Sequence, residues 1–210
     1  MPTMDKKIAD DFRVRMILYG FAKTGKTTWA LRAAEAGYNV ILCDLDDGYQ
    51  VAQRLSPEAQ KRVYHIDMRR PFGDILNSGA MTLCQAVGGK GIVYDETERR
   101  YHGIHGPFEE DHDYCVFNFA VRDLNTVLIM DSWTAFVEQL YHEKIFGNNP
   151  TETDKTEWDD YRIVQDVANI FLANLRALGI HVIVVAHAEE YARRKPDADK
   201  KAVGKDAIEG

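Results

Sequence analysis

An eight-residue pattern for binding phosphate places the strongest constraint on the fold of this chain. Residues 20–27 read GFAKTGKT and fit G-x-x-x-x-G-K-[ST] without a mismatch. The run that ends at Tyr19 is typical of a β-strand, and residues 27–36, ended by Gly37, are typical of a helix. A glycine-rich loop between a strand and a helix lets backbone N–H groups turn toward a phosphate at the positive end of the helix dipole. The pattern therefore predicts a nucleotide site.

Each residue of this loop has an expected role. The residues that we expect around the phosphates are Gly20, Phe21, Ala22, Lys23, Thr24, Gly25, Lys26, Thr27 and Thr28. Lys26 should reach the β and γ phosphates, and the Thr27 hydroxyl should bind Mg²⁺, a hard cation that takes few protein ligands. Asp131 ends the apolar run TVLIMD and should hold the magnesium shell through water.

Strand and helix patterns alternate along most of the chain. Apolar runs typical of strands occur at residues 39–43, 62–66, 126–131 and 180–186. Helical patterns occur at residues 73–87, 132–146 and 155–178. This alternation predicts an α/β fold with a mainly parallel central sheet flanked by helices. We expect a single domain over residues 1–210, with an inserted β-hairpin and loop at 88–122 and a mobile polar tail at 189–210.

Composition limits the compartment and the partners. No apolar run approaches the roughly 20 residues of a membrane-spanning helix, so we expect no membrane association. The 3 cysteines are too few for a disulfide framework, and the N-terminus lacks the apolar core of a signal peptide. These features predict a cytoplasmic, reduced setting. The formal net charge of −7 opposes binding to a polyanion without a local basic patch or an oligomer.

The order of the motifs resembles that of RecA-like P-loop ATPases. The phrases that carry the resemblance are GFAKTGKTTWA, LIMDSWTAF and HVIVVAHAEEY, within residues 13–190. The chain is most similar to phage-encoded RecA-like ATPases that act as single-strand annealing recombinases. The resemblance implies Mg²⁺-dependent ATP hydrolysis, self-association into a ring or filament, and action on single-stranded DNA in recombination, annealing or repair. It also implies the host cytoplasm as the location, with a single-strand-binding protein as a further candidate partner.

The resemblance gives roles to residues outside the phosphate loop. In RecA-like proteins the strand that ends in a polar sensor lies between the phosphate-loop strand and the metal-acid strand. His187 matches the sensor, and a histidine that only caps the strand is the alternative. The catalytic acid matches Asp46, with Asp44 and Asp47 as competitors and a solvated acidic turn as the alternative. Because many relatives have the longer Glu, we expect slow hydrolysis, with stimulation by DNA left open.

Two loops match the positions at which RecA-like proteins contact single-stranded DNA. They are residues 144–157 and 189–205, and the candidate contacts are Lys144, Lys155, Tyr191, Arg193, Arg194 and Lys195. Basic side chains neutralise phosphates and a tyrosine can stack on a base. Arg193 or Arg194 could instead act across a subunit interface, and a solvated tail is the alternative. RecA-like cores normally add a further strand after the sensor loop; without it, the phosphate-loop strand would lie at a sheet edge.

A weaker pattern lies in the expected insertion. Its members are His102, His105, His112 and Cys115, which form two pairs with two residues between the members. Zinc accepts His and Cys ligands, but structural zinc sites are richer in Cys, and the intervening residues are those of an exposed turn. We therefore do not expect zinc here.

Two other functions fit the same motifs. One is a non-catalytic, nucleotide-gated recombination partner, in which Asp46 is too short or misplaced. The other is a P-loop kinase for a small molecule, although no long arginine-rich lid is evident between the core motifs. The preference for ATP over GTP rests on the resemblance, and the lack of an evident Asn-Lys-x-Asp guanine motif agrees with it.

Overall fold

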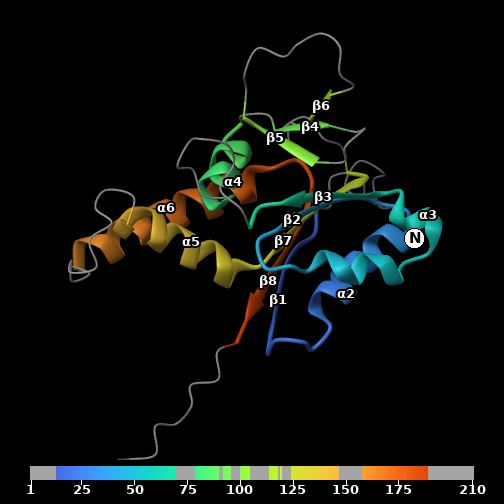
Figure 1. Ribbon diagram of the computed structural model, residues 1–210, viewed down its shortest axis with the longest axis horizontal. Coiled ribbons are helices and arrows are strands. Elements are labelled where there is room, and N and C mark those ends of the chain that lie inside the picture. The colour runs from blue at the N-terminus through green and yellow to red at the C-terminus, as the bar shows by residue number, and fades with distance from the viewer. Residues whose placement is uncertain are drawn as a thin grey trace, which may run out of the picture.

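A parallel sheet of five strands forms the centre of the fold (Figure 1). The computed structural model describes residues 13–69, 79–89, 92–95, 100–104, 114–117, 119, 124–146 and 158–188. The strands of this sheet are β1 (Arg15–Gly20), β2 (Asn39–Asp44), β3 (Val63–Asp67), β7 (Thr126–Asp131) and β8 (His181–His187). Their order is β1-β8-β7-β2-β3, and every neighbouring pair is parallel. The α/β class with a parallel central sheet is confirmed.

Helices cover both faces of the sheet (Figure 1). They are α2 (Lys26–Glu35), the 3-10 helix η1 (Tyr49–Arg54), α3 (Pro57–Gln60), α4 (Gly79–Val87), α5 (Trp133–Phe146) and α6 (Trp158–Ala177). The helix predicted at 73–87 corresponds to α4, and residues 73–78 lie outside the described part. The sequence patterns do not indicate η1 and α3, because segments this short show no helical periodicity. No helix in the described part combines the length and the apolar content needed to cross a bilayer.

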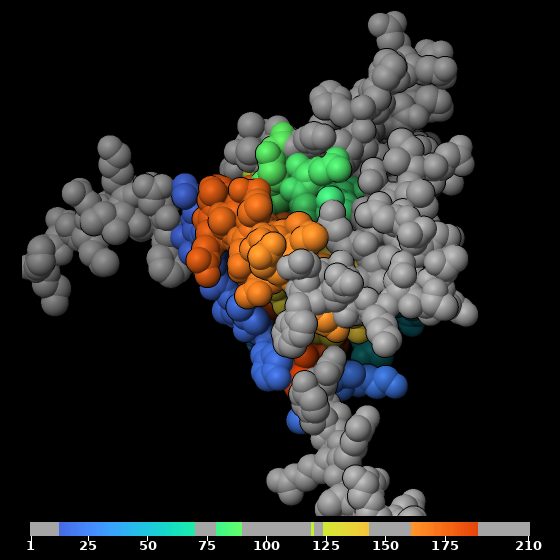
Figure 2. Space-filling view, turned by 90° about the vertical axis from the view of Figure 1, so that its left-hand side faces the viewer, coloured from blue at the N-terminus to red at the C-terminus, as the bar shows by residue number. Residues whose placement is uncertain are grey.

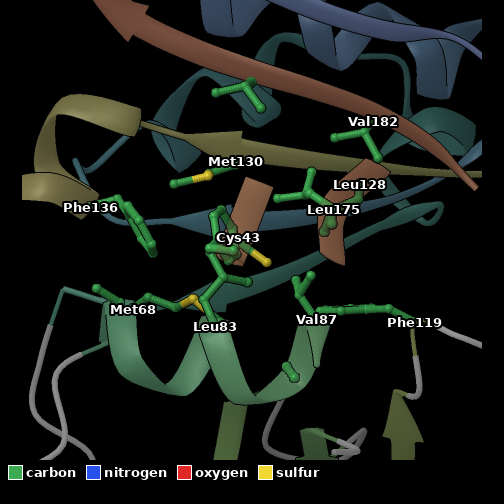
Figure 3. Close-up of a cluster of buried hydrophobic side chains, with 14 of the residues drawn as sticks. Cys43, Met68, Leu83, Val87, Phe119, Leu128, Met130, Phe136, Leu175 and Val182 are labelled. Atoms are coloured by element: carbon green, nitrogen blue, oxygen red, sulfur yellow. The ribbon is translucent and has the colours of Figure 1, made fainter. Parts of the chain in front are cut away.

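Two apolar cores bury the faces of the sheet. In Figure 3, Leu83 of α4, Phe136 of α5 and Leu175 of α6 meet around Cys43 and Met130 of the central strands. The second core packs α2, η1 and α3 on the other face, and its buried members include Leu31, Val40, Leu42, Ile129 and Val185. Each fully buried large side chain contributes about 1.5–3 kcal/mol. The two cores explain why the central strands read as continuous apolar runs.

Strand β1 lies at one edge of the described sheet, and β8 separates it from β7. This is the neighbour order expected for a sensor strand. Ile17 and Tyr19 point away from the core and are 68% and 72% exposed. The Arg15 guanidinium donates to the carbonyl oxygens of Arg176 and Leu178, each at 2.7 Å, and ties this edge to the end of α6. In Figure 2 the blue segment that contains β1 borders the orange-to-red segment of α6 and β8.

A small antiparallel sheet follows α4 in the chain. Its strands are β4 (Ile92–Asp95), β5 (Arg100–Ile104) and β6 (Tyr114–Phe117), in the order β5-β4-β6. Strands β4 and β5 correspond to the expected hairpin, whereas β6 was not expected, because its short apolar run lies among polar residues. The division into a core, an insertion and a tail stays a prediction, and residues 189–210 lie outside the described part.

Candidate functional site

The phosphate-binding loop connects the carboxyl end of β1 to the start of α2. Lys23 and Gly25 have left-handed backbones, with φ of 62° and 84°, which turn the chain tightly enough to form a cradle. The Thr24 hydroxyl donates to the Phe21 carbonyl oxygen at 2.8 Å and closes the loop. Gly25, which has no side chain, caps α2. The first N–H groups of α2 therefore remain available to an anion.

The ammonium group of Lys26 lies inside this loop. Its Nζ donates to the carbonyl oxygens of Gly20 at 2.9 Å and Phe21 at 2.6 Å, and it lies 3.3 Å from His187 Nδ1. The end of β8 positions His187, whose backbone N–H donates to Thr134 Oγ1 at 3.1 Å. Because a phosphate oxygen accepts more strongly than a peptide carbonyl, a nucleotide would take over the contacts of the ammonium.

The end of β7 places a buried carboxylate against the loop. Asp131 is 2% exposed, and its Oδ2 accepts a hydrogen bond from the Thr27 hydroxyl at 2.5 Å. Burial raises the pKa of Asp131, and the hydrogen bond from Thr27 opposes this effect. The charges of Asp44 and Asp46 also raise the pKa, whereas His187 lowers it. The environment therefore disfavours the charged form of Asp131 and would favour a cation beside it.

The oxygen atoms of Thr27 and Asp131 fit a magnesium ion. Mg²⁺ prefers oxygen ligands, keeps several waters and is usually bound through one or two carboxylates together with substrate phosphates. No group of three or more His, Cys, Asp or Glu side chains in the described part is placed to hold a metal. That finding is no obstacle for an ion whose ligands are mainly water and nucleotide.

The acidic loop, residues 45–48, packs against Asp131. The Leu45 N–H donates to the Asp131 carbonyl oxygen at 2.5 Å, and a Cβ added at Gly48 would collide with Asp131 Oδ2. Oδ2 of Asp46 lies 2.9 Å from His187 Nε2, but off the direction of an aligned hydrogen bond. One ring nitrogen of His187 therefore faces this acid, while the other faces the lysine of the phosphate loop.

Asp44 does not face this site. It is fully buried, and its Oδ1 accepts the N–H groups of Asp46 at 3.1 Å and Gly48 at 2.9 Å. Its Oδ2 accepts the Tyr49 N–H and lies beside His65 Nε2, both at 3.0 Å. Burial acts to raise the pKa of Asp44, but the hydrogen bonds from His65 and the backbone outweigh it, so the pKa lies below its usual value. Asp44 therefore holds the acidic loop in place through hydrogen bonds to its backbone.

Asp47 is held on the outer side of the loop. It has a left-handed backbone, with φ of 63°, and its carboxylate pairs with Arg69 Nη1 at 2.5 Å. The same guanidinium also binds Asp67 at 2.7 Å, and these acids raise the pKa of Arg69 above its usual value. Of the three candidate acids, Asp46 is the one that contacts His187 in the described structure.

Other predicted residues have side chains that lie outside the described part of the structure. Lys144 belongs to α5, His102 to β5 and Cys115 to β6, but their side chains are not among those described. The further residues outside the described part are His105, His112, Lys155, Tyr191, Arg193, Arg194 and Lys195. The DNA contacts and the absence of zinc at the His-rich pattern stay predictions.

His65 and Gly48 contribute to the site although no motif indicates them. A polar residue inside an apolar strand run is the one sequence signal for His65, and a glycine after acids fits any turn. The parallel register that sets Leu42 beside His65 brings this histidine next to the end of β2. Their part in the site therefore depends on strand pairing.

The comparison with known families agrees with this geometry. A family model described as an AAA domain matches residues 13–208. No curated protein matches the sequence. The matched range contains the phosphate loop, the acidic loop, Asp131 and His187. The chain therefore belongs to the AAA domain family, as an AAA-type P-loop ATPase.

Proposed function

We propose that this protein binds Mg²⁺ and ATP at the carboxyl edge of the parallel sheet and hydrolyses the nucleotide. The observation that carries this proposal is the meeting of three groups at that edge. They are Lys26 in the phosphate loop, the Thr27–Asp131 pair, and His187 beside Asp46. A phosphate chain laid on the loop would lie beside the Lys26 ammonium and His187, with Asp131 placed to hold a cation, as phosphoryl transfer requires.

Binding uses groups that the loop already presents. The N–H groups at the start of α2 would donate to phosphate oxygens, and Lys26 would exchange its carbonyl contacts for phosphate oxygens. Thr27 and Asp131 would hold Mg²⁺, which when bound supplies positive charge to the phosphate oxygens. The cation would also offset the cost of keeping the Asp131 carboxylate charged in a buried place.

Hydrolysis requires an acid that positions a water. Asp46 takes this role, because it contacts His187, which also reaches the ammonium of Lys26. The water oxygen forms a bond to the γ-phosphorus, the bond to the leaving oxygen of ADP breaks, and the water proton passes to Asp46 or to the released phosphate. Departure of phosphate would return His187 to its present contacts and thereby report the state of the nucleotide.

The biological setting that we propose is single-stranded DNA in recombination, annealing or repair, with self-association of the protein. The resemblance to phage RecA-like recombinases supports the DNA role. Edge strand β1 supports the self-association, because its outer edge has no neighbouring strand in the described sheet. Two large apolar side chains of this strand, Ile17 and Tyr19, are also exposed.

A nucleotide-gated partner without catalysis is the second candidate. One observation favours it: Asp46 Oδ2 lies 2.9 Å from His187 Nε2, and this short side chain would have to leave the histidine to orient a water. In that case ATP would hold a conformation or an interface, and turnover would be absent.

The test is Mg²⁺-dependent ATP turnover at low salt, with and without single-stranded DNA. Lys26→Ala should abolish turnover, whereas Lys61→Ala, a change at an exposed lysine just after α3, should leave it unchanged. Turnover that DNA increases and Lys26→Ala removes would support the recombinase role. ATP binding without turnover in both conditions would support the gated partner instead.

A further inference from the structure

His65 lies on β3, outside the phosphate contacts, and it contacts the two residues that flank the acidic loop, Asp44 and Tyr49. Its Nε2 lies 3.0 Å from Asp44 Oδ2, and its ring stacks on Tyr49 with the centroids 3.9 Å apart and the planes at 13°. The backbone N–H of Tyr49 also donates to Asp44 Oδ2, at 3.0 Å. The His65 side chain is 18% exposed and that of Asp44 is fully buried. The three residues thus form a closed ring of contacts.

The carboxylate in this ring sets the path of the acidic loop. It accepts the N–H groups of Asp46, Gly48 and Tyr49, so each turn of the loop is fixed to one buried group. The carboxylate needs a fixed orientation for these bonds to coexist. His65 provides the side-chain contact that orients it.

The loop transmits this orientation to the site. Gly48 lies against Asp131 Oδ2 without room for a Cβ, and the Asp46 side chain contacts His187. A small rotation of the Asp44 carboxylate would therefore move both the contact on the metal acid and the candidate acid for water.

We propose that His65 is a positioning residue for ATP hydrolysis. By holding Asp44, it keeps Asp46 beside His187 and Gly48 against Asp131. The inference rests on the proposed ATP hydrolysis for its effect on turnover, but the effect on the loop itself does not require hydrolysis.

A second residue near the end of β3 also holds the loop, and it offers a comparison. Arg69 pairs with Asp47 at side-chain exposures of 34% and 52%. Exposed ion pairs contribute little to stability because water screens them, whereas removing one partner of a buried hydrogen bond leaves the other partner unsatisfied. The buried contact of His65 should therefore matter more than the exposed contact of Arg69.

The test compares His65→Gln with His65→Asn in the full chain. The Gln amide can place an N–H near the position of Nε2, whereas the Asn amide is one methylene shorter and does not reach it. Hydrogen exchange at the backbone amides of Asp46, Gly48 and Tyr49 gives a readout that is independent of turnover. ATP turnover gives kcat and KM separately.

In His65→Asn, we expect exchange at these amides to accelerate about 10-fold and kcat to fall about 10-fold or more, equivalent to about 1.4 kcal/mol. KM for ATP should stay within about 3-fold, because the phosphate loop is untouched. His65→Gln should keep both properties near wild type. Val164→Ala, a buried change on α6, should lower the melting temperature without changing loop exchange or kcat.

Unchanged loop exchange in His65→Asn would overturn the proposal, as would a wild-type kcat in that variant. If His65→Gln and Val164→Ala accelerate loop exchange and lower kcat as much as His65→Asn does, the cause is general instability, and the proposal is also overturned. A wild-type protein that binds ATP without turnover would refute the proposed hydrolysis, and the exchange measurement would then decide the role of His65 in the loop.

Discussion

Asp46 and Asp47 are neighbouring acids with different contacts and form a matched pair. Asp46 contacts His187, whereas Asp47 pairs with Arg69 on the outer side of the loop. We predict that Asp46→Asn lowers kcat about 10²–10³-fold, within the range of a lost general base, and that Asp47→Asn changes it by less than about 3-fold. Mg²⁺-dependent ATP turnover measures both. Equal losses in the two variants would contradict the assignment of Asp46.

Asp131 carries a stability cost that Mg²⁺ should relieve. Because burial raises its pKa, the folded state binds the proton more tightly than the unfolded chain, whose Asp pKa is about 3.9. The stabilising effect of protonation is complete below that unfolded pKa and is lost as pH rises through the folded pKa. At pH 8 in EDTA, Asp131→Asn should therefore raise the melting temperature by about 2–4 °C, the shift that about 1 kcal/mol produces in a domain of this size.

This gain should shrink as the pH falls toward 4, and the variant should lose the extra stabilisation that Mg²⁺–ATP gives wild type. Thermal unfolding in EDTA and in Mg²⁺–ATP measures both effects. A lower melting temperature for Asp131→Asn in EDTA would show that the charged carboxylate stabilises the fold instead.

At the scale of elements, the acidic loop and β7 meet without room for another atom at Gly48. Gly48→Ala should push the loop away from Asp131 and lower kcat about 10-fold or more, while the strands keep their cores. Gly37→Ala is the control, because its left-handed backbone, with φ of 95°, makes a side chain costly, but a Cβ there meets no neighbour. The control should lower the melting temperature and keep kcat. Loss of kcat in both variants would point to backbone strain in general.

The elements themselves were predictable to the extent that they are long and periodic. The patterns at 39–43, 126–131 and 180–186 correspond to β2, β7 and β8, because buried parallel strands form continuous apolar runs. Short elements such as α3 and β6 were not predicted, because four residues are too few to show a periodic pattern.

At the scale of the whole molecule, the unpaired side of β1 is the expected place of self-association. Ile17 is 68% exposed on this strand, and Ile170 is 63% exposed on helix α6, outside the sheet. Because a lysine on an edge strand opposes pairing with another strand, Ile17→Lys should shift the protein toward the monomer. Ile170→Lys should not. Sedimentation velocity would measure this, and either a monomeric wild type or equal shifts in both variants would contradict the prediction.

The sequence by itself determined the fold class and the phosphate loop. The loop is one contiguous octet between a strand pattern and a helix pattern, so its geometry follows from neighbouring residues. Asp131 was likewise indicated as an acid that ends an apolar run, whereas His187 was singled out through the resemblance to RecA-like ATPases. Both lie at one edge because parallel strands of an α/β sheet bring their carboxyl ends together.

Only the tertiary structure decided which of three nearby acids meets His187. Asp44, Asp46 and Asp47 are alike in sequence, but the register of β2 with β3 and β7 buries the first beside His65. The loop then directs the second toward His187 and the third toward Arg69. Since side chains alternate between the faces of a strand, a shift of one residue in this pairing would separate Asp44 from His65, and no local pattern encodes the register.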